Sequence, residues 1–114
     1  MCMKIEINEV IKINQRYGGS LMNISTLDFE IDLANREKNI YKSNAHIVRG
    51  IILGHPFSDG NKRTTVELIA RRFAKFNIKC NEEQMVKGLV SIAKENIHEI
   101  NKIEARLRKW TKKI

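Results

Sequence analysis

Residues that interrupt regular secondary structure are rare in this chain. Its 114 residues include one proline, Pro56, and six glycines. Proline breaks helices because it lacks an N–H donor, and glycine weakens them through its backbone freedom. Apolar residues recur mainly at spacings of three and four, and strand-length alternation of apolar and polar residues is infrequent. We therefore expect an all-α protein, a compact bundle of five or six helices that forms a single domain over residues 1–114.

Cysteine and long apolar runs are also scarce. Cys2 and Cys80 are the only cysteines, and two thiols are too few for the disulfide framework of a small secreted protein. No apolar run approaches the length of a membrane span, and the amino-terminal residues lack the apolar stretch of a secretory signal. The sequence predicts a cytoplasmic protein that does not associate with membranes.

Acidic residues are outnumbered by basic ones. There are 13 Asp and Glu against 21 Lys and Arg, which gives a formal net charge of +8 at neutral pH. Such an excess attracts polyanions: nucleic acid, nucleotide phosphates or an acidic protein surface. A lysine-rich solvated surface has the same composition, and charge alone does not separate these interpretations.

The helical segments are predicted from apolar periodicity and from residues that cap helix ends. We expect helices over 7–17, from Ser25 or Thr26 past Ala34, over about 37–53, over about 60–76, from Asn81, and from about Ile97 onward. Residues 18–25 show no helical period and are expected to form an exposed loop or a short flap or hairpin. The periodicity also places Arg71, Arg72 and Lys75 near the surface, and Val86 and Ala93 on a buried face.

Residues 54–65 concentrate the reactive side chains of the chain. Gly54 closes a buried helix, and His55 precedes Pro56, a position where helical torsion angles are disfavoured. We therefore expect His55 in extended geometry just beyond the helix. Phe57 is the apolar side chain expected to anchor the loop in the core.

The following helix should begin at Gly60 or Asn61, and its first turn suits an anion. Free backbone N–H groups and the positive end of the helix dipole meet there. Glycine permits close approach to the backbone, Asn61 adds an amide donor, and Lys62 and Arg63 add two cations. The pattern is not a P-loop, because five residues separate Gly54 from Gly60, asparagine follows the second glycine, and a helix precedes the segment.

Asp59 and His55 add reactive groups beside this predicted anion-binding helix start. A carboxylate beside a phosphate repels it unless a hard divalent cation lies between them, so Asp59 suggests a Mg²⁺ ligand. An imidazole titrates near neutral pH and can accept the proton of a hydroxyl nucleophile. Together these groups predict transfer of a phosphorus group to a hydroxyl. The alternative is a plain turn, capped by Asp59 and followed by exposed charges, but the gathering of all these groups at one corner favours a site.

The residues His-Pro-Phe-Ser-Asp-Gly-Asn-Lys-Arg-Thr at 55–64 resemble the signature of the Fic/Doc (Fido) family, His-Pro-Phe-x-Asp/Glu-Gly-Asn-Gly/Lys-Arg. The resemblance extends over nearly the whole chain. Residues 16–19, Arg-Tyr-Gly-Gly, resemble the segment ahead of the substrate flap in death-on-curing (Doc) toxins. Residues 93–97 and the final helix with Trp110 resemble the carboxyl end of those toxins, and the short chain fits Doc better than the larger Fic enzymes.

The resemblance implies a helical fold that binds ATP with Mg²⁺ and modifies a Ser, Thr or Tyr hydroxyl of a target protein. His55 would be the catalytic base, Asp59 the metal ligand and Phe57 the anchor of the loop. The implied phosphate-binding residues are Gly60, Asn61, Lys62 and Arg63. The implied substrate flap, which aligns the target chain by strand addition, comprises Gly18, Gly19, Ser20, Leu21 and Met22.

Lys62 distinguishes two reactions within the family. Fic adenylyltransferases usually have glycine at this position, whereas Doc-like members have lysine, and there the resemblance implies a reversed nucleotide that presents its γ-phosphate. Lys62 therefore favours phosphoryl transfer, the activity of a Doc-type protein kinase and toxin. Pro56 and Gly60 are more like Fic, so AMP transfer by a Fic-type protein adenylyltransferase (AMPylation) is the alternative.

A DNA-binding module is a more distant alternative. It would use the positive charge and the helix that carries Arg71, Arg72 and Lys75. It leaves His55 and Asp59 unexplained, so we expect no nucleic-acid partner. A catalytically inactive scaffold is disfavoured as well, because the motif is intact at every position that carries a role.

The resemblance also implies control by a separate antitoxin protein that covers the ATP site. Ser91, Glu95 and Asn96 match the short inhibitory motif of self-regulated Fic proteins. We interpret this match as a coincidence, because the residues fall in a predicted core helix with Ile92 and Ala93 facing inward. The oligomeric state does not follow from the sequence.

Overall fold

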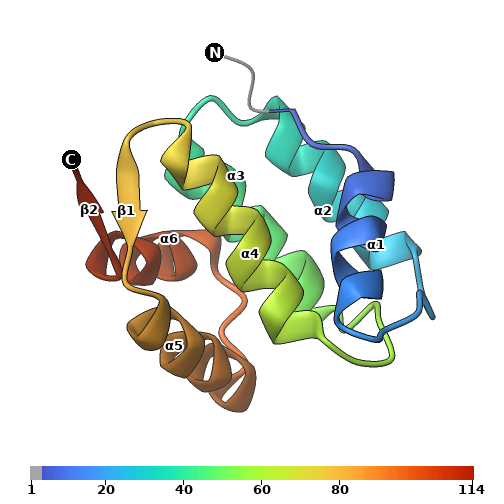
Figure 1. Ribbon diagram of the computed structural model, residues 1–114. Helices are drawn as coiled ribbons and strands as arrows, with labels where there is room; N and C mark the ends of the chain where they lie inside the picture. Colours follow the sequence, from blue (N-terminus) through green and yellow to red (C-terminus); the bar gives the residue numbers. More distant parts are fainter. Residues whose placement is uncertain (1–3) are drawn as a thin grey trace.

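The computed structural model describes residues 4–114 (Figure 1). The elements along the chain are α1 (Ile7–Arg16), α2 (Ser25–Arg36), α3 (Ile40–Val48), the π-helical turn η1 (Arg49–Leu53), α4 (Asn61–Ala74), β1 (Ile78–Cys80), α5 (Glu82–Glu95), α6 (Ile100–Lys109) and β2 (Thr111–Lys113). The expected all-α class is confirmed, with six α-helices in the described residues and a short flap before α2. Cys2 lies outside the described residues, and Cys80 is a free thiol.

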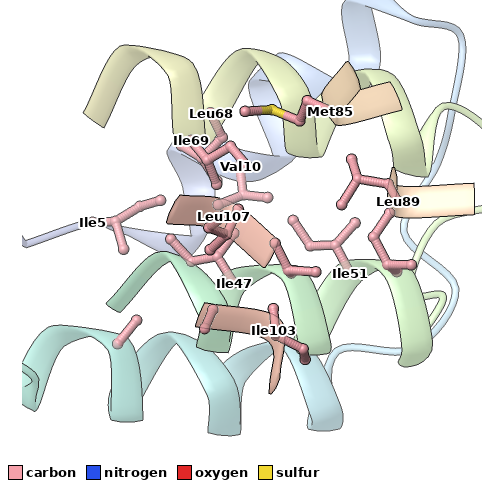
Figure 2. Close-up of a cluster of buried hydrophobic side chains, with 14 of the residues drawn as sticks. Ile5, Val10, Ile47, Ile51, Leu68, Ile69, Met85, Leu89, Ile103 and Leu107 are labelled. Atoms are coloured by element: carbon pink, nitrogen blue, oxygen red, sulfur yellow. The ribbon is translucent and has the colours of Figure 1, made fainter. Parts of the chain in front are cut away.

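The helix α3 and its continuation η1 form the centre of the bundle. They pack against α2, α4 and α6, while α1 packs on α4 (Figure 1). Apolar residues lie on more than one side of this helix, as expected for a helix with neighbours on several faces. Figure 2 shows Ile47 and Ile51 surrounded by buried side chains of the other elements, among them Ile5, Val10, Leu68, Ile69, Met85, Leu89, Ile103 and Leu107. Within residues 4–114, no helix combines the length and apolar character needed to cross a bilayer.

The helix expected over 37–53 begins later and ends differently. It starts at Ile40 because the side-chain oxygen of Asn39 accepts hydrogen bonds from backbone N–H groups of the first turn. Its last turn widens to a π-helix, in which the Gly54 N–H bonds to the Arg49 carbonyl at 3.1 Å. Apolar periodicity cannot reveal this widening, because the same residue types form both kinds of turn. The widened turn leads directly into the loop that carries His55.

The structure contains two short strands that the sequence did not predict. β1 pairs with β2 in antiparallel fashion, with Ile78 opposite Lys113 and Cys80 opposite Thr111. Strands of this length are too short to show a period of two. The turn out of α4 passes through Asn77, whose φ of 58° is left-handed, a conformation that asparagine tolerates better than most residues. The pairing places the last residues of the chain beside the end of α4 (Figure 1).

The structure corrects the expected surface position of Arg72. Its side chain donates hydrogen bonds to Oδ1 of Asn44 at 2.5 Å and to Oγ of Ser43 at 2.9 Å, and the residue is only 6% exposed. The expectation is wrong because α4 is covered by both α1 and α3, so its buried face is wider than one apolar stripe. Burial lowers the pKa of Arg72 to about 10, and the guanidinium therefore stays charged at neutral pH.

The helix α5 has a narrower buried face than the sequence indicates. Met85, Leu89 and Ile92 are buried, whereas Val86 is 42% exposed and Ala93 is also exposed. The expectation that Val86 and Ala93 belong to the core is therefore wrong. α5 lies at the edge of the bundle (Figure 1), where a single stripe of side chains is enough to contact η1, α4 and α6.

Candidate active site

The loop of residues 54–60 connects η1 to α4. Phe57 is fully buried in it, and Pro56 is buried as well. These two apolar side chains in the core fix the middle of the loop, while His55 before them and Ser58 and Asp59 after them remain exposed. The loop therefore presents His55 and Asp59 to solvent from a fixed position.

Asn61 closes the loop from its other end. Its side-chain oxygen accepts the Phe57 N–H at 3.2 Å, and its side-chain nitrogen donates to the Phe57 carbonyl at 2.9 Å. The same nitrogen lies 3.3 Å from Nδ1 of His55. Asn61 is the first residue of α4, so these contacts join the helix start to the loop and to the imidazole.

His55 does not adopt the expected extended conformation. Its φ is 47°, in the left-handed region, and its N–H bonds to the Ile51 carbonyl at 3.1 Å. The expectation is wrong because Pro56 disfavours right-handed helical torsions without specifying the alternative, and here the chain reverses immediately after the helix. A left-handed residue that is not glycine costs roughly 1–2 kcal/mol. Such strain is common where a side chain must be aimed for function.

The start of α4 presents free backbone donors. Gly60 precedes the helix with a φ of 74°, and a Cβ there would lie 2.9 Å from the Cβ of Tyr17. Both the left-handed torsion and the close packing therefore require glycine. In residues 4–114, no hydrogen bond engages the backbone N–H groups of Asn61, Lys62 or Arg63. These donors, at the positive end of the helix, can bind an anion.

The candidate side chains open onto one hollow of about 310 Å³, lined by Tyr17, His55, Ser58, Asp59, Gly60, Asn61, Lys62 and Arg63. A second hollow of about 620 Å³ shares Tyr17, Lys62 and Arg63 with the first, and it continues past Val66 and Ala70 of α4 to Val86 of α5. A wider hollow of about 940 Å³ lies along the outside of α1, and His55 and Asp59 do not line it. The structure thus brings the expected base, carboxylate and phosphate-binding residues to a single place.

Asp59 provides a carboxylate at the edge of this hollow. One of its side-chain oxygens accepts the Gly60 N–H at 2.8 Å. In the described part of the chain, no group of three or more His, Cys, Asp or Glu side chains could hold a metal ion by itself. Mg²⁺ requires only one or two carboxylates when substrate phosphates and water supply the remaining oxygens. A single carboxylate beside an anion site fits this cation.

Asn14 attaches α1 to the loop. Its side-chain nitrogen donates to the Asp59 carbonyl at 2.8 Å and lies 3.2 Å from the hydroxyl oxygen of Thr64. Gly19 completes the contact, because a Cβ there would lie 2.3 Å from both Oδ1 of Asn14 and the Asp59 carbonyl oxygen. The position of Asn14 on an apolar face indicates a buried hydrogen-bond partner, and this interpretation is confirmed. Its contact with the loop of residues 54–60 could not be predicted from the sequence.

Tyr17 and Glu67 are the side chains of this region that sequence reasoning missed. The Tyr17 hydroxyl donates to Oε1 of Glu67 at 2.6 Å, and Glu67 also forms ion pairs with Arg16 and, at 2.6 Å, with Arg71. The hydrogen bond with Glu67 raises the pKa of Tyr17. It also lowers the pKa of Glu67, and Arg16 and Arg71 act in the same direction. The spacing of Glu67 and Arg71 is the one sequence signal of this cluster.

The expected flap is held against the loop of residues 54–60 by backbone hydrogen bonds. Leu21 and Phe57 form an antiparallel bridge, in which the Met22 N–H bonds to the Pro56 carbonyl at 2.8 Å and the Ser58 N–H to the Ser20 carbonyl at 2.9 Å. In this pattern the N–H and C=O of the bridged residue itself point to the opposite side. Leu21 therefore presents one backbone donor and one acceptor away from the loop, and neither has a partner among residues 4–114.

The Ser91, Glu95 and Asn96 motif lies on α5 and at its end. The Ser91 hydroxyl bonds to the Glu95 carboxylate, and Arg106 of α6 donates to Ser91 at 3.0 Å and lies 3.8 Å from Glu95. These contacts place the Glu95 carboxylate between α5 and α6. Its described partners do not include His55 of the 54–60 loop, nor Lys62 or Arg63 of the first turn of α4.

The basic residues of α4 do not form a continuous surface stripe. Arg72 is buried against α3, and Arg71 pairs with Glu67. Arg72 is therefore not part of the helix surface that the DNA-binding alternative would use, whereas Arg71 and Lys75 are exposed.

Comparison with protein families finds a match to a model described as the Fic/DOC family, over residues 6–71. The matched region covers more than half of the chain and runs from the start of α1 into α4. It contains every residue that lines the first hollow. Comparison with curated proteins found no match, and comparison with solved structures also found none. The helices α5 and α6 and the two strands lie beyond the matched residues.

Proposed function

The chain belongs to the Fic/Doc family, whose members are generally transferases that act on proteins, and from this we propose that it is a Doc-type protein kinase. In this proposal the γ-phosphoryl group of ATP passes to a Ser, Thr or Tyr hydroxyl of a target protein. The supporting observation is the shared hollow, in which His55, Asp59 and the free N–H groups of α4 meet.

The proposed reaction is a displacement at phosphorus. His55 accepts the hydroxyl proton as the oxygen attacks the γ-phosphorus, the bond from phosphorus to the bridging β–γ oxygen breaks, and ADP leaves. Asp59 would hold Mg²⁺, which supplies charge neutralisation between the phosphates when it is bound. The backbone N–H groups after Gly60 and the cations Lys62 and Arg63 bind phosphate oxygens.

Asn61 contributes to phosphate binding through its backbone in this proposal. Its side-chain amide is already engaged by Phe57 and lies beside His55. The side chain therefore orients the loop and the imidazole, while the N–H of Asn61 at the first position of α4 is available to the nucleotide.

Lys62 supports transfer of the γ-phosphoryl group over transfer of AMP. It lines both hollows and occupies a position where Fic-type members usually have glycine. The alternative is AMP transfer, which is favoured by Gly60 and Pro56, two residues that are typical of Fic members. In either reaction, the apolar side chains Val66, Ala70 and Val86 of the second hollow are suited to contact the nucleoside.

The flap supports capture of an extended target segment. On the side away from the loop, the N–H and C=O of Leu21 have no partner within the described chain, which is the arrangement that an added strand requires. A target strand paired with Leu21 would run beside the flap, close to the loop that carries His55. We include in this proposal a cytoplasmic location and a separate antitoxin protein that covers the ATP site.

The proposal is tested by following each phosphate of ATP. The protein is incubated with cell extract and Mg²⁺ in the presence of ATP labelled at the α- or γ-phosphate. Label that enters a protein only from the γ-position supports the kinase, and label from the α-position contradicts it in favour of AMP transfer. His55→Ala should reduce labelling by about 100-fold or more, the contribution typical of a general base.

His98→Ala is the matched control, because His98 is exposed and lies outside both hollows. It should label targets as the wild type does. Transfer by His55→Ala at the wild-type rate would contradict the catalytic role of His55, and absence of transfer from both positions would contradict the proposed function.

A further inference from the structure

Arg63 and Glu67 occupy positions on α4 that ordinarily form an ion pair. They are four residues apart, so their side chains lie on the same face of the helix, one turn from each other. A pair between them would neutralise Arg63, one of the two cations at the anion-binding start of α4. Among the ion pairs of the described residues, there is none between Arg63 and Glu67.

Glu67 is instead bound by three other side chains. Arg71, one turn further along α4, lies 2.6 Å from the carboxylate, and Arg16 from the end of α1 binds the same oxygen. The Tyr17 hydroxyl occupies the second oxygen at 2.6 Å. A glutamate also pairs better with a cation four residues after it than with one four residues before it, so the helix itself favours Arg71 over Arg63.

Arg63 is left facing the two hollows. Its guanidinium lies 6.0 Å from the centre of the Tyr17 ring, the same residue whose hydroxyl binds Glu67. Within residues 4–114, no carboxylate lies within ion-pair distance of Arg63. Tyr17 therefore contacts both residues: its hydroxyl binds the Glu67 carboxylate, and its ring lies beside the Arg63 guanidinium.

We propose that Arg16, Tyr17 and Arg71 are positioning residues that hold Glu67 away from Arg63 and so keep Arg63 available for a phosphate. The proposal rests on the proposed function for the identity of the anion. The competition for Glu67, between Arg63 and the three side chains that now bind it, rests on the geometry alone. The simpler alternative is that the cluster only attaches α1 to α4. The proposal and this alternative predict different results for Glu67. Under the proposal, replacing Glu67 restores the affinity for the phosphate ligand that is lost when Arg16 and Arg71 are replaced.

The first experiment measures binding of ATP with Mg²⁺ by isothermal titration calorimetry. The double variant Arg16→Gln/Arg71→Gln should bind about three- to tenfold more weakly than the wild type, because Glu67 then competes for Arg63. Adding Glu67→Gln to this double variant should restore the dissociation constant to within about twofold of the wild-type value. Under the simpler alternative, the triple variant binds no better than the double variant.

Two controls separate this effect from loss of positive charge. Arg36→Gln/Lys102→Gln removes the same charge from exposed pairs with Asp32 and Glu99, and its affinity should stay within about twofold of wild type. Adding Asp32→Asn to Arg16→Gln/Arg71→Gln restores the same charge as Glu67→Gln does, but it should leave binding weak.

The second experiment measures the chemical accessibility of the Arg63 side chain in the absence of a nucleotide. Phenylglyoxal modifies arginine side chains, and mass spectrometry of peptides gives the rate at Arg63. The rate should fall by about threefold in Arg16→Gln/Arg71→Gln, when Glu67 pairs with Arg63, and should recover when Glu67→Gln is added.

The two experiments separate failure of this inference from failure of the proposed function. If the wild type binds no ATP, the proposed function is contradicted, whereas the phenylglyoxal rates still decide whether Glu67 captures Arg63. An unchanged rate at Arg63 in the double variant overturns the inference, and so does a triple variant that reacts and binds like the double variant.

Discussion

At the scale of single residues, Asn61 connects the chemistry of the loop to the start of α4. Both polar atoms of its side chain bind the backbone of Phe57, and its nitrogen lies 3.3 Å from Nδ1 of His55. The side chain is buried, so no bulk water replaces these bonds when they are lost. The orientation of His55 therefore depends on a neighbour six positions along the chain.

Asn61→Ala should destabilise the fold by about 1–3 kcal/mol, because it leaves the buried N–H and C=O of Phe57 without partners. The free energy of unfolding, measured by urea denaturation, checks this prediction. The variant should also lose transfer activity before it loses its fold, since the loop that carries His55 is no longer held.

Lys62→Ala is the control for this prediction. Lys62 follows Asn61 in the same helical turn but is exposed, so the change should alter stability by no more than about 0.5 kcal/mol. Equal costs for the two variants would contradict the structural role given to the Asn61 side chain.

At the scale of elements, α5 packs closely against the end of α6. Gly88 lies in the middle of α5, and the ring of Trp110 occupies the space that a side chain there would need. A Cβ at Gly88 would lie 1.8 Å from Cζ2 and 2.4 Å from Cε2 of Trp110. Glycine within a helix is unfavourable by itself, so its presence here reflects this close approach of the indole.

Gly88→Ala should destabilise the protein although alanine is the better helix former. Overpacking costs about 1–3 kcal/mol, more than the roughly 1 kcal/mol that alanine contributes through helix propensity. A lower midpoint in thermal or urea denaturation checks this prediction.

The effect of Gly88→Ala on stability should reverse once the indole ring of Trp110 is removed. In a Trp110→Leu background, Gly88→Ala should be neutral or stabilising, because only the gain in helix propensity remains. A cost that persists in this background would show that the ring of Trp110 is not its cause.

At the scale of the whole molecule, a buried ionic cluster joins four parts of the chain. Glu30 of α2 is 4% exposed, lies 3.0 Å from Nδ1 of His46 on α3, and accepts from Nε of Arg49 in η1 at 2.6 Å. Arg49 also donates to the carbonyl of His98, between α5 and α6, at 3.1 Å. Because Glu30 is buried, its charge stabilises the fold only while these partners are in place.

The stability of the protein should fall in acid, partly through Glu30. Burial alone would raise the pKa of Glu30, but the hydrogen bonds with His46 and Arg49 outweigh it and hold the pKa below its ordinary value of 4.5. The stabilisation is therefore fully present above pH 4.5 and is lost as the pH falls through the lower pKa of the folded state. Urea denaturation at a series of pH values between neutral and acid measures this loss.

Glu30→Gln should remove this part of the pH dependence. At neutral pH the variant should be less stable than the wild type by about 1.5–3 kcal/mol, since Arg49 loses a charged hydrogen-bond partner. The difference should shrink as the pH falls below 4.5, where the wild-type carboxylate also loses its charge. Glu83→Gln, in an exposed pair with Lys87, serves as the control and should show no such convergence.

Much of the fold and the grouping of the candidate site residues could be predicted because their signals are local. The helices show apolar spacings of three and four, and residues 55–63 are contiguous, so the loop and the helix start could be identified together. The burial of Arg72 and the exposure of Val86 could not be predicted, because each depends on which helices cover α4 and α5. The strands β1 and β2 were missed because each is three residues long.

By itself, the sequence determined the helical class and the order of reactive groups from His55 to Arg63, since both depend on residues near one another in the chain. Tertiary structure alone decided how these groups are held. Asn14 reaches the Asp59 carbonyl, and Tyr17 reaches Glu67, across separations of 45 and 50 residues. Such contacts depend on how α1 packs against α4, and no local pattern encodes that packing. The availability of Arg63 is therefore a property of the assembled bundle.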